Sequence, residues 1–463
     1  MELVGVLTPP VVSGALPVLG HVGEFRKDRT ALLERGYREH GRVFTIKLGP
    51  QPVAVLVGPD HQRTFFTETD KRLNISTPYA FLRTTFGEVL FIAEHQEYLR
   101  QRPFVTQAFG REKMVRYIEI MAIETQKWLD SLGDEGQFEV AGTMARLAQE
   151  IAAHALMGER FQAEAGREFW DLYQDLSKAL DPILPPNLPL PKFWRRDKAK
   201  ARMAEILQPI LDERRQNRDR YDDFLQDFVN ARYKDTDEPI DDEVLLNLML
   251  ALMFAGHETT AGQAAWNVIL LLQHPDYLAL VQEEVDRCVR PGQMDGKTLH
   301  DLTHLGYAVR ETERLRPSAD MLLRDVDEEI EAGGYRIPAG WKVQVAAELA
   351  HHLPELFDEP DRYDPLRYGP ERAEDKADRF SLIGFGGGTH KCTGMNFANN
   401  EMTVIAALLL RQFELELLTP EPQIERGLGA NRPEATHIAY RRKVVDAAAG
   451  AEPAAAAGCP FHG

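Results

Sequence analysis

A glycine-rich segment, residues 385–394, runs directly into an apolar helical pattern and restricts the possible folds more than any other part of the sequence. Cys392 lies in this segment, at the start of the expected helix. A helix N-terminus stabilises a thiolate through its dipole and its free backbone N–H groups, and glycines let the backbone approach the sulfur or a flat ligand closely. Such a cysteine suits metal ligation, whereas a lone cysteine near a helix start more commonly packs in a core. A phosphate-binding loop would require Gly-Lys-Ser/Thr at its end, which is absent.

Charge and cysteine content exclude several classes of protein. The 463 residues include 54 basic and 72 acidic side chains, a net charge of −18, which argues against nucleic acid as a partner. Cysteines occur only at 288, 392 and 459, too scattered for a disulfide framework or a four-thiolate zinc site. The first twenty residues are broken by prolines and glycines and lack a basic start, so we expect no signal peptide and no transmembrane anchor. These features predict a cytoplasmic protein.

Hydrophobic periodicity predicts a mainly α fold with a small β region. Helical periods dominate residues 59–310, including a long pattern at 241–274, and a further helix is expected at 395–413. Strand patterns occur at 43–48 and 53–57, and again at 334–346 and 424–440, so we expect strands from both ends of the chain to meet in one small sheet. The pattern indicates a single domain over residues 1–445, followed by an Ala/Gly-rich, disordered tail at 446–463.

The ten residues 385–394 together resemble the haem-binding loop of the cytochrome P450 family. In that family the cysteine thiolate is the proximal ligand of the iron of haem b and pushes electron density toward it. The resemblance therefore implies that Cys392 ligates haem iron, that His390 donates to a haem propionate and that Phe385 packs beside the sulfur. The resemblance also implies that Gly386 and Gly394 of this loop contact the cofactor.

A second element contains Glu311 and Arg314, three residues apart and hence on one helix face. Taken alone, such a pair is typical of a surface salt bridge of little consequence. It precedes a Leu-Arg-Pro run upstream of Cys392, and this arrangement resembles the family's Glu-x-x-Arg helix. Arg367 matches the third member of the family's charge triad. The resemblance implies that the three residues hold the scaffold of the haem loop and take no part in catalysis.

A third element places polar residues in the middle of the long apolar helix. Burying the carboxylate of Glu258 and the hydroxyl of Thr259 is costly unless a functional cavity solvates them. A zincin motif is excluded because position 261, where a second histidine would stand, is Ala261. The segment resembles the family's oxygen-binding groove, which implies Ala255 beside the haem, Thr259 over the iron, and Glu258 with Thr259 as a proton relay. The alternative is a helix kinked by threonine hydroxyls that bond back to the backbone.

The resemblance also implies a clamp for the haem propionates. Tyr98 and Arg102 fall where the family commonly has Trp-x-x-x-Arg, and Arg324 occupies the usual arginine position on the strand beyond the Glu-x-x-Arg helix. With His390, these cationic and hydroxyl groups are expected to form a site for the two carboxylates. The fold implied is that of the family, with haem between the long central helix and the helix after the cysteine loop.

Residues 79–91 resemble the substrate-side signature of bacterial sterol 14α-demethylases. Those enzymes usually carry His-Thr where this chain has Glu258-Thr259, a form shared with hydroxylases of retinoids, terpenoids and fatty acids. Asp320 is a candidate pocket carboxylate that, if unpaired, would favour a polar or cationic substrate group; a solvent-facing position is the alternative. The expected pocket residues are Tyr79, Phe81, Phe86, Leu90, His257, Asp320 and Met321.

The function implied is a monooxygenase that inserts one oxygen atom of O2 into a lipophilic small molecule, such as a sterol or terpenoid, with fatty-acid or retinoid hydroxylation as alternatives. No flavin or iron–sulfur domain fits in the rest of the chain, so a separate donor, a ferredoxin with its reductase, must supply electrons. We expect it to dock near Lys391, where Arg111, Lys113 and Arg116 would face an acidic partner. A thiolate-haem protein that binds ligands without oxygenation is the rival class; the Glu258-Thr259 pair argues against it.

Overall fold

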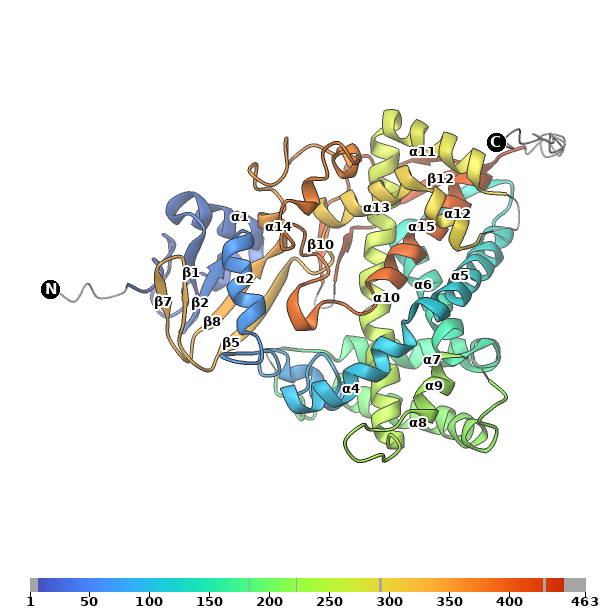
Figure 1. The fold of residues 1–463 in the computed structure, drawn as a ribbon, viewed down its shortest axis with the longest axis horizontal. Helices are drawn as coiled ribbons and strands as arrows, with labels where there is room; N and C mark the ends of the chain where they lie inside the picture. Colours follow the sequence, from blue (N-terminus) through green and yellow to red (C-terminus); the bar gives the residue numbers. More distant parts are fainter. Residues whose placement is uncertain (1–6, 183, 222, 291–293, 428–429, 445–463) are drawn as a thin grey trace, which may run out of the picture.

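The computed structural model describes residues 7–182, 184–221, 223–290, 294–427 and 430–444. It is mainly helical with a small β region, as predicted (Figure 1). The α-helices are α1 (Val22–His40), α2 (Pro59–Glu68), α3 (Arg83–Phe86), α4 (His95–Ala108), α5 (Arg111–Ser131), α6 (Val140–Met157), α7 (Glu159–Lys178), α8 (Pro191–Gln216), α9 (Phe224–Asn230), α10 (Asp242–Gln273), α11 (Pro275–Cys288), α12 (Gly296–Asp301), α13 (Thr303–Leu315), α14 (Ala347–Ala350) and α15 (Met395–Gln412). The tail expected at 446–463 lies outside the described residues.

The strands form one larger sheet and several small ones. They are β1 (Val43–Leu48), β2 (Gln51–Leu56), β3 (Leu73–Asn74), β4 (Glu135–Glu139), β5 (Met321–Val326), β6 (Ile330–Ala332), β7 (Tyr335–Ile337), β8 (Lys342–Ala346), β9 (Phe413–Leu417), β10 (Ile424–Arg426), β11 (Asn431–Pro433) and β12 (His437–Arg442). The larger sheet has the order β1-β2-β8-β5-β3, with β2 and β8 parallel and the other neighbours antiparallel. The amino-terminal hairpin therefore does meet strands from the second half of the chain.

The carboxy-terminal strands do not join that sheet, so this part of the prediction was wrong. β10 pairs with β11, while β12 lies between β9 and β4. β4 occupies the glycine-containing stretch after α5, which lacks the apolar alternation that predicts a strand. A Cβ atom at Gly136 would lie 2.6 Å from the hydroxyl of Tyr440, so the glycine makes room for the β12 side chain. The pairing of β4 with β12 depends on packing between the two strands, which the periodicity of either strand alone cannot predict.

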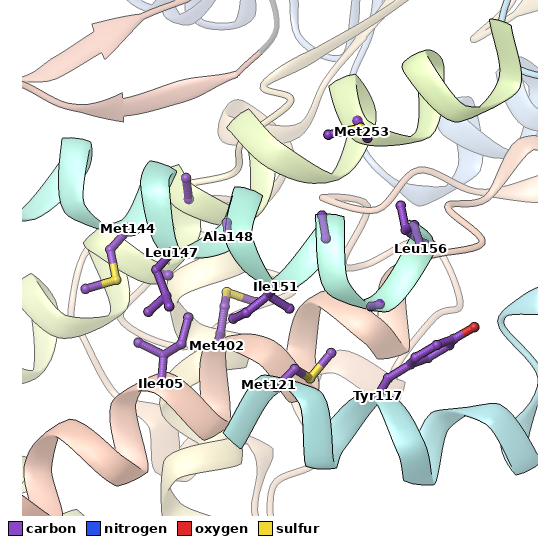
Figure 2. Close-up of a cluster of buried hydrophobic side chains, with 14 of the residues drawn as sticks. Tyr117, Met121, Met144, Leu147, Ala148, Ile151, Leu156, Met253, Met402 and Ile405 are labelled. Carbon is purple, nitrogen blue, oxygen red and sulfur yellow. The ribbon is translucent and has the colours of Figure 1, made fainter. Parts of the chain in front are cut away.

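The long helix α10 runs through the middle of the molecule, between the larger sheet and the helices α5, α6 and α15 (Figure 1). Among the described residues, α10 is the one helix that is long and apolar enough to cross a membrane. Within its most apolar stretch of 18 residues, however, 61% is buried inside the protein. Figure 2 shows part of that interior, where Met144, Leu147 and Ile151 of α6 lie near Met402 and Ile405 of α15. Both α6 and α15 also pack against α10, so the positions of α10 and α15 are fixed relative to each other. The segment 385–394 precedes α15 on the side of the sheet.

Candidate active site

A cavity of about 740 Å³ lies where α10, β5 and the glycine-rich segment meet. Its wall also includes residues from 78–91, which connect β3 to α4, and from the start of α15. Of the residues expected at a cofactor or substrate site, the structure brings the following to this wall: Tyr79, Phe81, Leu90, Tyr98, Ala255, Thr259, Asp320, Met321, Arg324, Phe385, Gly386, His390, Cys392 and Gly394.

Cys392 stands three residues before α15, and its backbone N–H donates to the carbonyl of Phe385 at 3.0 Å. Burial raises the pKa of the Cys392 thiol, while backbone N–H groups of Gly394 and Met395 act to lower it. Gly388 adopts a φ of +64°, and a Cβ there would lie 2.8 Å from the carbonyl oxygen of Phe66. The glycine therefore lets the loop lie against α2, and the thiol borders the cavity. A sulfur presented in this way can bind a metal from one side.

Arg324 is a buried cation that borders the same cavity. It is 3% exposed, its Nε donates to the Thr69 hydroxyl at 3.3 Å, and its guanidinium lies 4.8 Å from the centre of the Phe65 ring. No carboxylate within the described ranges forms an ion pair with it. Burial lowers the pKa of Arg324, because a desolvated cation without an anion is costly. A ligand that carries a carboxylate would supply the missing partner.

Tyr98, Arg102 and His390 hold the cysteine loop to α4 and to the turn after α2. The Tyr98 hydroxyl donates to the carbonyl of Thr389 at 2.6 Å, and Arg102 contacts the same carbonyl. His390 Nε2 lies 2.7 Å from the carboxylate of Asp70. Although burial opposes it, the hydrogen bond with His390 keeps the pKa of Asp70 below its ordinary value. His390 thus already has a carboxylate partner, unlike Arg324.

On α10, Ala255 and Thr259 border the cavity, but Glu258 does not. The Thr259 hydroxyl donates to the carbonyl of Ala255 at 2.5 Å, which is the bond back to the helix backbone that the alternative interpretation expects. The Ser318 hydroxyl donates to the Thr259 carbonyl at 2.8 Å. Glu258 faces α7, where its carboxylate accepts from the Ser177 hydroxyl at 2.9 Å. Thr259 and Glu258 therefore lie on different sides of the same helical turn, between the cavity and α7.

Two residues expected in the pocket lie outside its wall. His257 packs against Trp170 of α7 with ring centres 4.7 Å apart, and burial lowers its pKa to about 4. Consecutive residues of a helix point about 100° apart, so the turn that presents Ala255 and Thr259 to the cavity directs His257 elsewhere. Phe86 is fully buried behind Phe254, with ring centres 5.0 Å apart, and Phe254 forms the wall.

Asp320 borders the cavity and is buried, so the solvent-facing alternative does not hold. Its carboxylate is paired, however, so the condition under which it would attract a polar or cationic substrate group is not met. Arg29 donates to it at 2.7 Å and Arg426 at 2.9 Å. These arginines belong to α1 and β10, at opposite ends of the chain, so residue spacing could not predict that they contact Asp320. A paired carboxylate exerts little attraction on a cationic ligand.

Glu311, Arg314 and Arg367 are completely buried and form one ion-pair network. Two nitrogens of Arg314 donate to Glu311 at 2.8 and 2.9 Å, and Arg367 donates to it at 3.2 Å. Burial opposes ionisation, but Arg314 and Arg367 hold the pKa of Glu311 below its ordinary value. Arg314 also donates to the carbonyl of His351, whose Nε2 accepts from the backbone N–H of Ile383, two residues before the cysteine loop. The network thus reaches the loop through His351.

Sequence reasoning missed polar residues that border the cavity beside the cysteine. Burial raises the pKa of Glu313 to about 7, and Glu401 of α15 is buried with one carboxyl oxygen unpartnered in the described structure. The signal that could have found Glu401 is helical spacing: Gly394, Phe397 and Ala398 share its face of α15, and all of them border the cavity. Gln263 and Gln344 also belong to the wall.

Comparison with known proteins agrees with this arrangement of fold and cavity. The sequence model of cytochrome P450 matches residues 9–438. The chain belongs to the cytochrome P450 family. It is 31% identical to a sterol 14α-demethylase of Mycolicibacterium vanbaalenii over 447 residues, which cover 94% of this chain and 98% of that relative. It is 32% identical to the sterol 14-demethylase of Arabidopsis thaliana over 90% of this chain and 88% of the relative.

A solved P450 structure shows the same fold. The cyanobacterial CYP120A1 with bound retinoic acid superposes with a TM-score of 0.84 at 25% identity and covers 95% of this chain and 100% of that chain. Cytochromes P450 are haem b monooxygenases, which use O2, a substrate and electrons from a redox partner. The cavity suits this cofactor because its wall includes the Cys392 thiol and the buried Arg324, which has no carboxylate partner in the part of the chain that the structure describes.

Proposed function

We propose that Cys392 ligates the haem iron as a thiolate and that Arg324 binds a haem propionate. The proposal rests on two groups that share one cavity wall: a thiol near a helix N-terminus, and a buried arginine that forms no ion pair with a carboxylate of the described residues. Tyr98, Arg102 and His390 then act mainly by holding the loop that bears the cysteine. When bound, haem supplies the redox chemistry of O2 activation, and the thiolate tunes it.

The substrate that fits this cavity best is a lipophilic small molecule. Apolar side chains from several elements form most of the wall above the cysteine, among them Phe81, Leu90, Leu156, Leu180 and Phe254. Relatives named sterol 14α-demethylases, together with the segment 79–91, favour a 14α-methyl sterol as the first candidate. The retinoic acid bound to CYP120A1 favours a retinoid or related terpenoid as the second.

A spectral titration tests this choice. Purified ferric holoprotein is titrated with lanosterol, retinoic acid, farnesol and dodecanoic acid, and the Soret band is followed toward high spin. We expect a saturable shift with lanosterol, because a sterol that fills the cavity displaces water from the iron. A shift with another class alone contradicts the sterol assignment, and no shift with any of them contradicts the lipophilic-substrate assignment.

Thr259 is the proposed proton donor at the cavity side of α10, and Glu258 supplies protons from the side of α7. Replacing Thr259 by alanine removes the only hydroxyl of that residue, so we expect product formation to fall by about 100-fold, the lower range for loss of general acid catalysis. Ligand binding, measured by the Soret titration, is expected to stay the same. Thr259→Ser restores the hydroxyl and serves as the control; equal activity of the alanine and serine variants would remove Thr259 from the relay.

The electron donor we propose is a ferredoxin that docks near Lys391. Arg111 and Arg116 are exposed at the start of α5 and are available to an acidic partner, whereas Lys113 lies 3.4 Å from the carboxylate of Asp227. We also propose that residues 1–445 act as one unit in the cytoplasm, which the burial of the apolar helix α10 supports.

A further inference from the structure

The cavity continues from the cysteine region along the larger sheet, on the face that packs against α1. Residues that alternate along a strand share a face, and Leu323 of β5 lies opposite Gln344 of β8 in the register of the sheet. The side chains that border this arm of the cavity are Phe25, Arg29, Leu48, Val53, Met321, Leu323, Lys342 and Gln344. The arm is thus mainly apolar, with three polar side chains.

Gln344 has no hydrogen-bond partner for its amide nitrogen among the described residues. Its side chain is only 2% exposed, and it borders the cavity. Burying an amide donor without an acceptor costs free energy on folding, because the water that solvated it is lost. A ligand oxygen in the arm would accept the hydrogen bond after a rotation of the terminal amide.

Both cations of the arm are already paired with carboxylates. Arg29 donates to Asp320 at 2.7 and 2.9 Å, and Lys342 contacts Asp325. A carboxylate placed beside Gln344 would therefore lose its water without gaining an unpaired cation. A neutral oxygen, as in a hydroxyl or ketone, meets the amide at a lower desolvation cost.

We propose that Gln344 determines specificity by donating a hydrogen bond to a neutral oxygen at the end of the substrate remote from the reacting carbon. This inference rests on the proposed function, because it assumes a lipophilic substrate held over the cysteine region. The expected substrate is then a lipophilic alcohol or ketone. Lipophilic acids and plain hydrocarbons of the same skeleton bind less tightly.

The test compares matched ligands in the holoprotein and in two variants. The probes are lanosterol with its 3-deoxy analogue, retinol with retinoic acid, and 1-dodecanol with dodecanoic acid, each titrated by the Soret shift. We expect the wild type to bind the alcohol of at least one pair about 10-fold more tightly than its partner, as one net hydrogen bond provides. Gln344→Leu is expected to remove this preference without weakening binding of the partner that lacks the hydroxyl.

Gln62→Leu is the matched control, since Gln62 of α2 is also fully buried with both amide atoms unpartnered among the described residues, but it does not border the cavity. It is expected to keep the preference. Thermal unfolding gives a second readout: Gln344→Leu should be at least as stable as the wild type, because an unpaired amide is removed. If it fails to fold, or melts at a lower temperature, Gln344 has a structural role and the proposal is overturned.

The outcomes also separate this proposal from the one it rests on. A wild type that binds probes with no preference for alcohols overturns the role of Gln344 and leaves the lipophilic substrate standing. A wild type that shows no shift with any probe contradicts the lipophilic substrate itself, and the role of Gln344 with it. If the acids bind more tightly than the alcohols, a carboxylate is not disfavoured in the arm although Arg29 and Lys342 are already paired, and the proposal is overturned.

Discussion

Replacing Cys392 by alanine is expected to abolish oxidation of any lipophilic substrate by this protein. The Cys392 thiol lies just before the N-terminus of α15 and borders the cavity, where it can reach a bound metal. Loss of an outer-shell partner of a metal ligand typically costs 10- to 100-fold, so loss of the ligand itself should exceed about 100-fold. The measurement is product formation with a ferredoxin, its reductase and NADPH.

Cys288→Ala is the matched control, because Cys288 is half-buried near the end of α11 and does not border the cavity. It should keep nearly the full rate. The reduced carbon monoxide complex adds a spectroscopic readout, since the red-shifted Soret band of a thiolate-ligated haem should be present in the control and absent without Cys392. A Cys392→Ala protein that retains that band would place the ligand elsewhere.

The second large effect is expected at Glu311. Changing it to alanine leaves Arg314 as a buried charge with no carboxylate partner among the described residues, whereas Arg367 keeps its ion pair with Glu374. Breaking a buried ion pair in this way costs about 3–5 kcal/mol. We therefore expect the free energy of unfolding, measured by urea denaturation of the holoprotein, to fall by that amount, with less haem retained.

Glu34→Ala provides the comparison, because Glu34 and Arg38 form an exposed pair on α1. Its effect should stay within about 0.5 kcal/mol. The lowered pKa of Glu311 gives a related pH dependence: its stabilisation is complete above the ordinary value of 4.5 and is lost as the pH falls through the lower folded-state pKa. Equal losses in the two variants would show that the buried network does not support the fold.

Local sequence patterns predicted the parts of the site that depend on local structure. The loop around Cys392 could be found because glycines, a basic residue and a cysteine are close together in the chain. The hairpin of β1 and β2 and the long helix α10 follow from periodicity, which local residues set. Glu311 and Arg314 lie on the same helical turn, so their proximity was also predictable.

Contacts between distant segments could not be predicted in the same way. The pairing of Asp320 with Arg29 and Arg426 joins the residue before β5 to α1 and β10, and each partner lies about 100 or more residues away in the sequence. His257 was misplaced because the pattern showed a polar turn without showing which residue faced the cavity. Gln344 could not be predicted, because a single glutamine in a strand forms no sequence pattern that indicates a binding site. Its position beside the cavity is seen only in the structure.

Oxygenation of a lipophilic molecule held beside Cys392 can be followed with an oxygen isotope. A ligand that shifts the Soret band is incubated with the holoprotein, ferredoxin, reductase, NADPH and ¹⁸O2, and the product is analysed by mass spectrometry. We expect a product in which one oxygen atom comes from ¹⁸O2, and no product from Cys392→Ala. Recovery of the bound ligand unchanged, or a product whose new oxygen comes from water, would contradict this expectation.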